Sequence, residues 1–428
     1  MTNENKPAGK PKDSTKSTAE RVFDLAIGIL EKWEKGSPFD DIMDDDLVAS
    51  GLRRTVSDIF FSYFRNKAGI DFVIDSHTKN VKPKMRRILS VAMTQMHFQT
   101  GIPPQIAADV AVSYASARFG KTQGGFINAV LRKTGAKSFK DHLYGVPANV
   151  ASGLPELLHR RWSAEFGAEV AGRLSSLLKE KCELTFRLSG GAGPEVLKDM
   201  ACEPVELPFL GPRIKFFVAA NAKSLFDSGL LDSGSIYIQD PAAAAAPLLL
   251  DPKPGEDILD MCAAPGGKSL MMADLERNVR LTAADRSESR QKKTASNFKR
   301  AGLNATVVTA DAASASFAAN SFDAILLDVP CTNTGVFRHK PDALWRFSEG
   351  KLKELVALQS VILENSVRYL KPGGRIVYST CSIENAENAG QVDAFLSKHP
   401  EFSKTGEVLL MPCRSNDGAY AVCLRRNS

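Results

Sequence analysis

The spacing of apolar residues changes twice along this chain. In the first third they recur three and four positions apart, as from Arg21 to Leu30 and from Met85 to Phe98. This spacing is typical of amphipathic helices joined by short loops. We therefore predict an all-α domain over residues 19–145. Residues 1–18 mix Lys, Pro, Ser and Thr without periodicity, which predicts a disordered tail.

A second pattern begins where Pro147 and the stretch Gly153–Pro155 interrupt the helical spacing. Two further helices are expected over residues 156–166 and 170–178. A strand over residues 184–188 and a segment rich in glycine and proline come next. We interpret residues 146–233 as a linker and a small α+β insert.

From residue 234 onward, short apolar runs alternate with helical patterns. Strands are expected over residues 257–261, 281–285, 306–311, 322–328 and 374–379, with helices over 287–301 and 351–369. Strands that alternate with helices indicate βαβ units and a parallel sheet. We therefore predict an α/β Rossmann-like domain over residues 234–428. Two last strands, 407–411 and 420–425, are expected to form an antiparallel edge.

Composition limits the classes of function and location. The net charge of +6 is compatible with a polyanionic partner but is weak evidence alone. No apolar run approaches the roughly 20 residues of a membrane span, and the N-terminus lacks the apolar core of a secretory signal. Seven cysteines without regular spacing indicate a reducing compartment, so we expect a cytoplasmic protein. Because no paired Cys-x-x-Cys occurs, we expect no metal site.

Acidic residues close several predicted strands: Asp260, Asp285, Asp311 and Asp328. Ligands of open α/β sheets bind outside the carboxyl ends of the strands. The turn over residues 264–268 opens a helix, yet it is neither a phosphate loop nor a dinucleotide motif. Asp285 is spaced to meet ribose hydroxyls, and Asp311 to accept from an adenine amino group. A ribose and an adenine without a phosphate site indicate S-adenosylmethionine, although the turn alone also fits a tight strand-to-helix connection.

Cys331 and Cys381 follow the fourth and fifth of these strands, which we expect to be neighbours. Carbon 5 of a pyrimidine is too weak a nucleophile to accept a methyl group unaided. Addition of a thiolate to carbon 6 makes carbon 5 reactive and divides one hard step into two easier ones. Asp328 is placed to activate nitrogen 3 of the ring. Placement does not rank the two thiols, and it assigns the other cysteines to the core.

Three segments resemble motifs of the NOL1/NOP2/Sun family of RNA cytosine-5 methyltransferases. Residues 260–269 are similar to its cofactor motif, residues 328–335 to its Pro-Cys motif and residues 378–382 to its Thr-Cys motif. Residues 86–89 and 125–132 resemble a NusB-like RNA-binding domain. This fusion is the layout of the RsmB (Sun) branch, which modifies small-subunit ribosomal RNA.

The resemblance implies S-adenosylmethionine-dependent methylation of carbon 5 of a cytosine in 16S ribosomal RNA. We separately expect the protein to be a monomer. The resemblance also implies that Cys381 is the nucleophile and that Cys331 aids product release. The implied cofactor pocket comprises Cys262, Ala263, Ala264, Pro265, Gly266, Gly267, Lys268, Asp285, Asp311 and Asp328. Thr332 and Asn333 replace the usual Ser-Gly or Ser-Ala pair, which leaves the target nucleotide open. The alternatives are the same chemistry on transfer RNA, or a noncatalytic NusB-like RNA-binding or antitermination protein.

Basic and aromatic residues after the Pro-Cys motif suggest a contact with nucleic acid. We expect Arg338, His339, Lys340 and Arg346 to hold phosphates and Phe337 or Trp345 to stack on a base. A solvated loop with ordinary charges is the alternative. Basic residues of the helical domain extend this footprint, unless they form a plain solvated face: Arg53, Arg54, Lys84, Arg86, Arg87, Arg132 and Lys133.

Overall fold

The computed structural model describes residues 17–37, 39–43 and 51–427. It divides the chain into two compact units, residues 1–159 and 160–428. The predicted disordered tail lies outside the described residues except for Ser17 and Thr18. Ser17 caps the first helix, which begins at Thr18, one residue before the predicted start.

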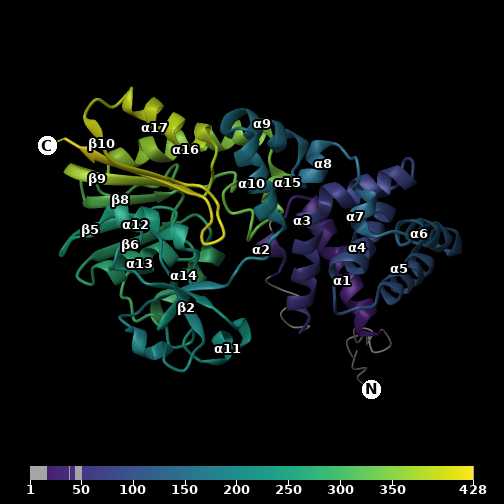
Figure 1. Ribbon diagram of the computed structural model, residues 1–428. Coiled ribbons are helices and arrows are strands. Elements are labelled where there is room, and N and C mark those ends of the chain that lie inside the picture. The colour runs from purple at the N-terminus through teal and green to yellow at the C-terminus, as the bar shows by residue number, and fades with distance from the viewer. Residues whose placement is uncertain (1–16, 38, 44–50, 428) are drawn as a thin grey trace, which may run out of the picture. The chain divides into compact units, whose positions relative to one another are not determined.

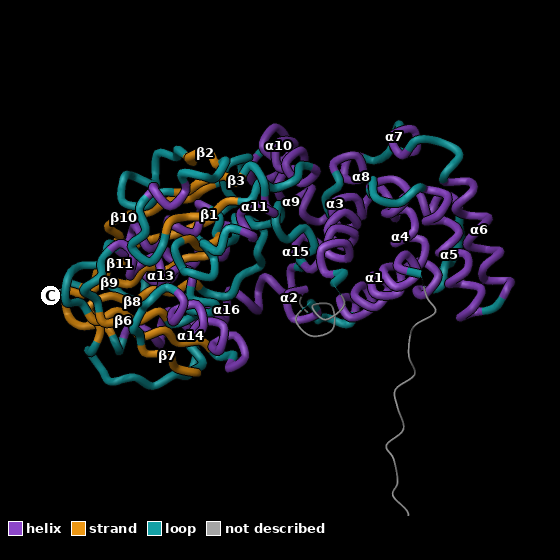
Figure 2. Tube along the Cα trace, turned by 90° about the horizontal axis from the view of Figure 1, so that it is seen from below, coloured by secondary structure: helices purple, strands orange, loops and turns teal. Residues whose placement is uncertain are grey.

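The first unit is helical throughout its described residues (Figure 2). Its helices are α1 (Thr18–Glu34), α2 (Phe39–Ile42), α3 (Arg53–His77), α4 (Pro83–Phe98), α5 (Pro104–Phe119), α6 (Lys121–Thr134), α7 (Phe139–His142) and α8 (Ala148–Ser152). Helix α4 contacts α1, α3, α5 and α6. It is buried over every residue from Ile88 to Gln95, as expected for the central helix of a bundle. The predicted all-α domain is confirmed.

The second unit contains a small antiparallel sheet in the order β2-β3-β1-β4. The strands of this sheet are β1 (Thr185–Leu188), β2 (Cys202–Val205), β3 (Phe216–Ala219) and β4 (Ile236–Ile238). The helices in this part of the chain are α9 (Glu156–Phe166), α10 (Ala168–Lys179) and α11 (Ala222–Asp227). Phe186, Leu197, Leu225 and Ile236 form its core. Strand β4 lies beyond residue 234, so the small sheet includes residues from the segment that we assigned to the larger domain.

The larger sheet has the strand order β10-β11-β9-β8-β5-β6-β7. Strands β9, β8, β5, β6 and β7 are parallel, whereas β11 and β10 form the predicted antiparallel edge. The strands are β5 (Asp257–Asp260), β6 (Arg280–Asp285), β7 (Thr306–Thr309), β8 (Phe322–Asp328), β9 (Leu370–Thr380), β10 (Phe402–Leu410) and β11 (Ala419–Arg426). The predicted Rossmann-like class is confirmed.

Helices cover both faces of the larger sheet (Figure 1). They are α12 (Ala245–Leu250), α13 (Gly267–Leu275), α14 (Glu288–Arg300), α16 (Glu349–Val367) and α17 (Ala389–Leu396), and the short helix α15 (Ala343–Arg346) precedes α16. Helices α16 and α17 pack on one face, and α12, α13 and α14 on the other. The central strands therefore read as continuous apolar runs, such as Ala324–Leu327. Among the described residues, no helix has both the length and the apolar character needed to cross a bilayer.

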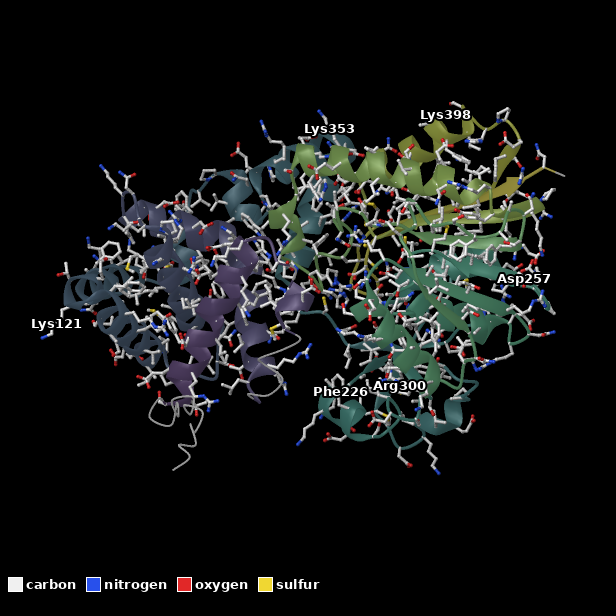
Figure 3. All side chains as sticks on the ribbon, turned by 180° about the vertical axis from the view of Figure 1, so that it is seen from behind. Lys121, Phe226, Asp257, Arg300, Lys353 and Lys398 are labelled. Atoms are coloured by element: carbon white, nitrogen blue, oxygen red, sulfur yellow. The ribbon has the colours of Figure 1, made fainter. Side chains whose placement is uncertain are left out.

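Parallel pairing places the carboxyl ends of β5, β6, β8 and β9 at one edge of the sheet. Asp257, the first residue of β5, marks the opposite edge (Figure 3). Asp328 at the end of β8 lies beside Ser379, near the end of β9. The turns that follow these two strands, which carry Cys331 and Cys381, are thereby brought together.

Candidate active site

A cavity of about 300 Å³ opens at the carboxyl edge of the larger sheet. Residues from five strand ends and the turns after them line it, including Cys262, Asp285, Asp311, Asp328, Cys331 and Cys381. Of the other residues predicted for the cofactor, Ala264 also lines the cavity. Ala263 is buried, Pro265 and Gly266 complete the turn, and Gly267 and Lys268 begin α13. The sheet therefore brings residues that lie up to 120 positions apart, Met261 and Cys381, into one pocket.

The two thiols face each other in this cavity. The Sγ atoms of Cys331 and Cys381 are 3.3 Å apart, and the Cys381 thiol donates to Asn333 Oδ1 at 2.9 Å. The hydrogen bond with Cys381 and burial both raise the pKa of Cys331 well above its ordinary value. These two effects hold Cys331 in its protonated form, and a thiol reacts as a nucleophile only through its thiolate.

The turns that carry the thiols are pinned together by buried contacts. The Gly335 backbone N–H donates to the Cys381 carbonyl at 2.9 Å. A Cβ atom at Gly335 would lie 2.8 Å from the same oxygen, so only glycine allows this approach. Buried Glu387 accepts from the Thr332 N–H at 2.9 Å and from Gln359 Nε2 at 3.0 Å. This network keeps the two sulfur atoms in place without a covalent bond.

Asp328 forms an ion pair within the site. Lys268 Nζ lies 2.6 Å from one Asp328 oxygen, and the Ser379 hydroxyl donates to the other at 3.1 Å. Burial opposes the charge on Lys268, but the neighbouring Asp328 carboxylate keeps the pKa of Lys268 above its ordinary value. The proton donor of this pair is therefore the Lys268 ammonium, and Asp328 holds it in position.

Asp285 is fixed between the glycine turn and α14. It accepts from the Ala264 N–H at 3.2 Å and lies 3.4 Å from Arg290 Nη1. Arg290 also donates to the Ala264 carbonyl, so it contacts both the turn and the carboxylate that holds the turn. Asp311 accepts one backbone N–H through Oδ1 and lines the same cavity. The Asp285 and Asp311 carboxylates line one cavity and can accept from the hydroxyl and amino groups of a nucleoside. Arg290 is a contact that no sequence pattern indicated.

Asp260 and Cys262 lie beneath the turn with different surroundings. Burial raises the pKa of Asp260 to about 7, and the Ser269 hydroxyl donates to its carboxyl at 2.6 Å. Burial and the charge of Asp260 raise the pKa of Cys262 well above its usual value. Cys262 thus packs against the hydrophobic core, as its placement suggested, and also lines the cavity.

The Pro-Cys loop is held by residues that we had expected to bind nucleic acid. Phe337 is fully buried and packs against Trp162, with ring centroids 5.8 Å apart, so its predicted role in stacking on a base is wrong. Arg338 is also buried and donates to the Arg414 carbonyl at 2.7 Å, which contradicts its predicted role at phosphates. In the helical unit, Arg87 pairs with Glu34 at 2.8 Å.

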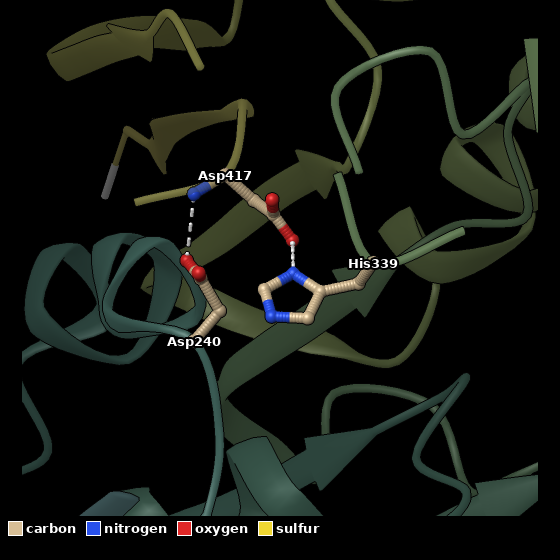
Figure 4. A group of neighbouring side chains, drawn as sticks. All are labelled: Asp240, His339 and Asp417. Atoms are coloured by element: carbon tan, nitrogen blue, oxygen red, sulfur yellow. Dashed lines mark hydrogen bonds and ion pairs between the residues drawn. The ribbon is translucent and has the colours of Figure 1, made fainter. Parts of the chain in front are cut away.

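His339 belongs to a cluster with Asp240 and Asp417 (Figure 4). His339 Nδ1 lies 2.7 Å from Asp417 Oδ2, and the Asp417 N–H donates to Asp240 Oδ1 at 2.9 Å. Burial opposes the His339 charge, but the bond to Asp417 raises the pKa of His339 to about 10. Burial and the charge of Asp417 raise the pKa of Asp240 to about 6. We assign the cluster a structural role, because it joins three distant segments that border the site.

Helix α9 supports the turn after Cys381. Glu384 in this turn is fully buried and accepts from Trp162 Nε1 at 2.9 Å and from Arg161 Nε. The N–H of the next residue, Asn385, donates to Glu165 at 3.4 Å. A buried carboxylate beside the thiols is thus paired with side chains from much earlier in the chain.

Family models match two parts of the chain. A model described as 16S rRNA methyltransferase RsmB/F matches residues 247–416, and a NusB family model matches residues 24–135. The probable ribosomal RNA small subunit methyltransferase B of Bacillus subtilis is 29% identical over 401 residues, 89% of each chain. The ribosomal RNA small subunit methyltransferase B of Shewanella oneidensis is 43% identical over 167 residues, and this alignment spans 39% of each chain.

Solved structures share the fold. The crystal structure of PH0851 has a TM-score of 0.76 at 25% identity, covering 96% of this chain and all of that one. A methyltransferase homolog from Pyrococcus horikoshii has a TM-score of 0.56 at 25% identity, over 65% of this chain and 97% of that one. NSun6 from the same organism, solved with SFG, has a TM-score of 0.55 at 20% identity, over 64% and 98%.

Proposed function

Because the chain combines a NusB family domain with a methyltransferase domain of the RsmB/F family, we propose that it methylates carbon 5 of a cytosine in 16S ribosomal RNA, using S-adenosylmethionine. The observation that carries the proposal is the pair of thiols 3.3 Å apart, which open into the cavity that also holds Asp285 and Asp311. A methyltransferase that acts on nitrogen or oxygen has no need of two cysteines at this place.

The residues of the cavity fit the proposed cofactor. Asp285 is nearly fully buried and held by the glycine turn, so its carboxylate is rigid enough to orient a ribose. Asp311 follows the next strand, where a carboxylate accepts from an adenine amino group. When bound, S-adenosylmethionine supplies an electrophilic methyl group. The task of the protein is then to keep that group and the target carbon in line.

The thiols supply the step that activates the base. Cys381 attacks carbon 6 of cytosine, and the added electron pair makes carbon 5 nucleophilic. The Lys268 ammonium, held by Asp328, is a positive charge at the same site and offers a hydrogen bond to the ring. After methylation, water takes the proton from carbon 5, the electron pair of that bond restores the double bond between carbons 5 and 6, and the carbon–sulfur bond breaks with its electron pair leaving on Cys381. Cys331 lies close enough to the leaving sulfur to assist this elimination.

Support for ribosomal RNA comes from the family description and from the Bacillus subtilis relative, whose alignment spans 89% of both chains. The target base must leave any stack to reach a cavity at the sheet edge. We further propose that the protein acts as a monomer in the cytoplasm, where its seven free cysteines stay reduced.

Bisulfite sequencing of ribosomal and transfer RNA from cells with and without the gene tests the substrate. A modified cytosine in 16S RNA that disappears with the gene is expected. Loss of a modified cytosine in transfer RNA instead would show that transfer RNA, and not 16S RNA, is the substrate. No change in either RNA, together with no binding of S-adenosylmethionine by calorimetry, would favour a noncatalytic RNA-binding protein.

Substitution of each thiol tests the mechanism. Cys381→Ala is expected to abolish methyl transfer, whereas Cys331→Ala is expected to accumulate a covalent RNA–protein adduct because product release stalls. A denaturing gel after incubation with RNA and S-adenosylmethionine separates the two. An adduct with Cys381→Ala and none with Cys331→Ala would exchange the roles of the two cysteines.

A further inference from the structure

Asn333 lies beside the two thiols in an uncommon backbone conformation. Its φ of 60° falls in the left-handed region, which asparagine tolerates better than most other residues. Its amide Nδ2 donates to the Cys331 carbonyl at 3.1 Å. Because this end of the amide is fixed by a backbone acceptor, the other end presents Oδ1 to the Cys381 thiol at 2.9 Å.

This arrangement gives the Cys381 proton a defined acceptor. The Cys331 sulfur lies 3.3 Å from Cys381 Sγ and is a weak acceptor, whereas an amide oxygen is a strong one. Cys331 Sγ is 4.0 Å from the same amide oxygen, so the closer contact belongs to Cys381. Asn333 also lines the cavity that both sulfur atoms face. The amide therefore distinguishes between two thiols that are otherwise placed alike.

We infer that Asn333 is a positioning residue for Cys381: its amide oxygen orients the thiol toward the cavity and restrains its reactivity while no base is bound. The inference rests on the proposed function, since it concerns the sulfur that attacks the base. A fixed acceptor stabilises the protonated form of a thiol, and only the thiolate reacts with alkylating agents. Asn333 thus keeps a reactive sulfur aligned without leaving it exposed to unwanted chemistry.

The test measures alkylation of Cys381 by iodoacetamide across a range of pH, read by peptide mass, without RNA or cofactor. Exposed Cys413 donates to Asn416 Oδ1 at 2.9 Å and serves as the internal reference. Asn333→Gly removes the amide and retains the φ of 60°, which glycine adopts freely. Loss of one hydrogen bond is expected to speed alkylation of Cys381 about threefold to tenfold at neutral pH and to move the profile to lower pH.

Asn333→Asp distinguishes this role from a general loosening of the fold. The carboxylate keeps an acceptor and adds a negative charge beside the sulfur, so alkylation is expected to slow and its profile to move to higher pH. Local unfolding would speed alkylation in both variants. Asn320 is exposed and also has a positive φ, of 49°, so Asn320→Gly is the matched control and should leave both readouts unchanged.

Single-turnover methyl transfer completes the test. Asn333→Gly is expected to slow it about threefold to tenfold with the RNA KM unchanged, because a misdirected thiol affects the reacting step alone. Equal alkylation profiles for the parent and both variants, or shifts in the same direction, would overturn the inference while leaving the proposed function intact. Absence of methyl transfer in the parent, with the alkylation shifts present, would instead reject the proposed function.

Discussion

Arg187→Met tests how the small sheet supports the glycine turn. Arg187 lies on β1 with its side chain 1% exposed. Its guanidinium donates to Asp274 at 2.5 Å, to Gln239 at 2.9 Å and to the carbonyl of Gly267, the first residue of α13, at 3.2 Å. Methionine fills a similar volume but supplies none of these bonds, so a carboxylate and two further acceptors lose their donor.

The cost follows from the burial of the pair. Removing one partner of a buried ion pair costs about 3–5 kcal/mol. Asp274 is 16% exposed and keeps bonds from Ser189, the Gly190 N–H and Arg277 at 3.0 Å, which favours the lower end, about 3 kcal/mol. For a unit of this size, the melting temperature should fall by about 6–12 °C. Arg213 pairs with Asp251 at 2.8 Å with both side chains exposed, so Arg213→Met should cost about 0–1 kcal/mol.

Thermal and urea unfolding of the two variants, followed by fluorescence, measures this difference. Calorimetric titration with S-adenosylmethionine should also show weaker binding for Arg187→Met, since the start of α13 loses a contact. Equal melting temperatures for the Arg187 and Arg213 variants would refute the reasoning. Burial would then have no effect on how much an ion pair contributes to the free energy of unfolding.

Three further outcomes are expected. Asp311→Ala should weaken binding of S-adenosylmethionine more than binding of RNA, and equal losses in the two titrations would contradict its placement. Peroxide should convert Cys331 and Cys381 into a disulfide with release of water, since their sulfurs lie 3.3 Å apart. Activity should then be lost and return with dithiothreitol, and an unchanged thiol count would reject this. Burial raises the pKa of Asp260 to about 7, so its stabilising neutral form is lost as the pH rises from about 4 to about 7. Asp260→Asn stays neutral, and its stability relative to the parent should rise across that range, as urea titrations at each pH would show.

The larger sheet could be predicted because its strands are apolar runs bounded by polar turns. Strand β8 occupies the predicted residues 322–328, and the neighbouring positions of β8 and β9 followed from their order in the chain. The first and last residues of other strands could not be predicted as accurately from the sequence. Strand β9 begins at Leu370, four residues before the predicted start at residue 374, because its first residue pairs with Phe322 of β8.

Side-chain partners from distant segments were beyond the reach of sequence patterns. From the sequence, Arg338 is expected to be a cation on the surface. In the folded protein it is buried and donates to the Arg414 carbonyl. Arg187 is a single charged residue within a short strand, and nothing in the neighbouring sequence indicates that Asp274 is its ion-pair partner. Asn333 was visible as a departure from the family motif, but its contact with Cys381 depends on two turns that only the sheet brings together.

The support that α9 gives to Glu384 bears on how this enzyme can be divided into fragments. Trp162 reaches a carboxylate 222 positions later in the chain. A recombinant fragment that starts at residue 234 would contain the whole larger sheet and both thiols. The Glu384 carboxylate, three residues after Cys381, would then be buried without the bonds that Arg161 and Trp162 donate to it. A fragment that keeps these bonds must therefore start upstream of Arg161, and the helical first unit can be removed or exchanged only at a position that leaves α9 joined to the larger sheet.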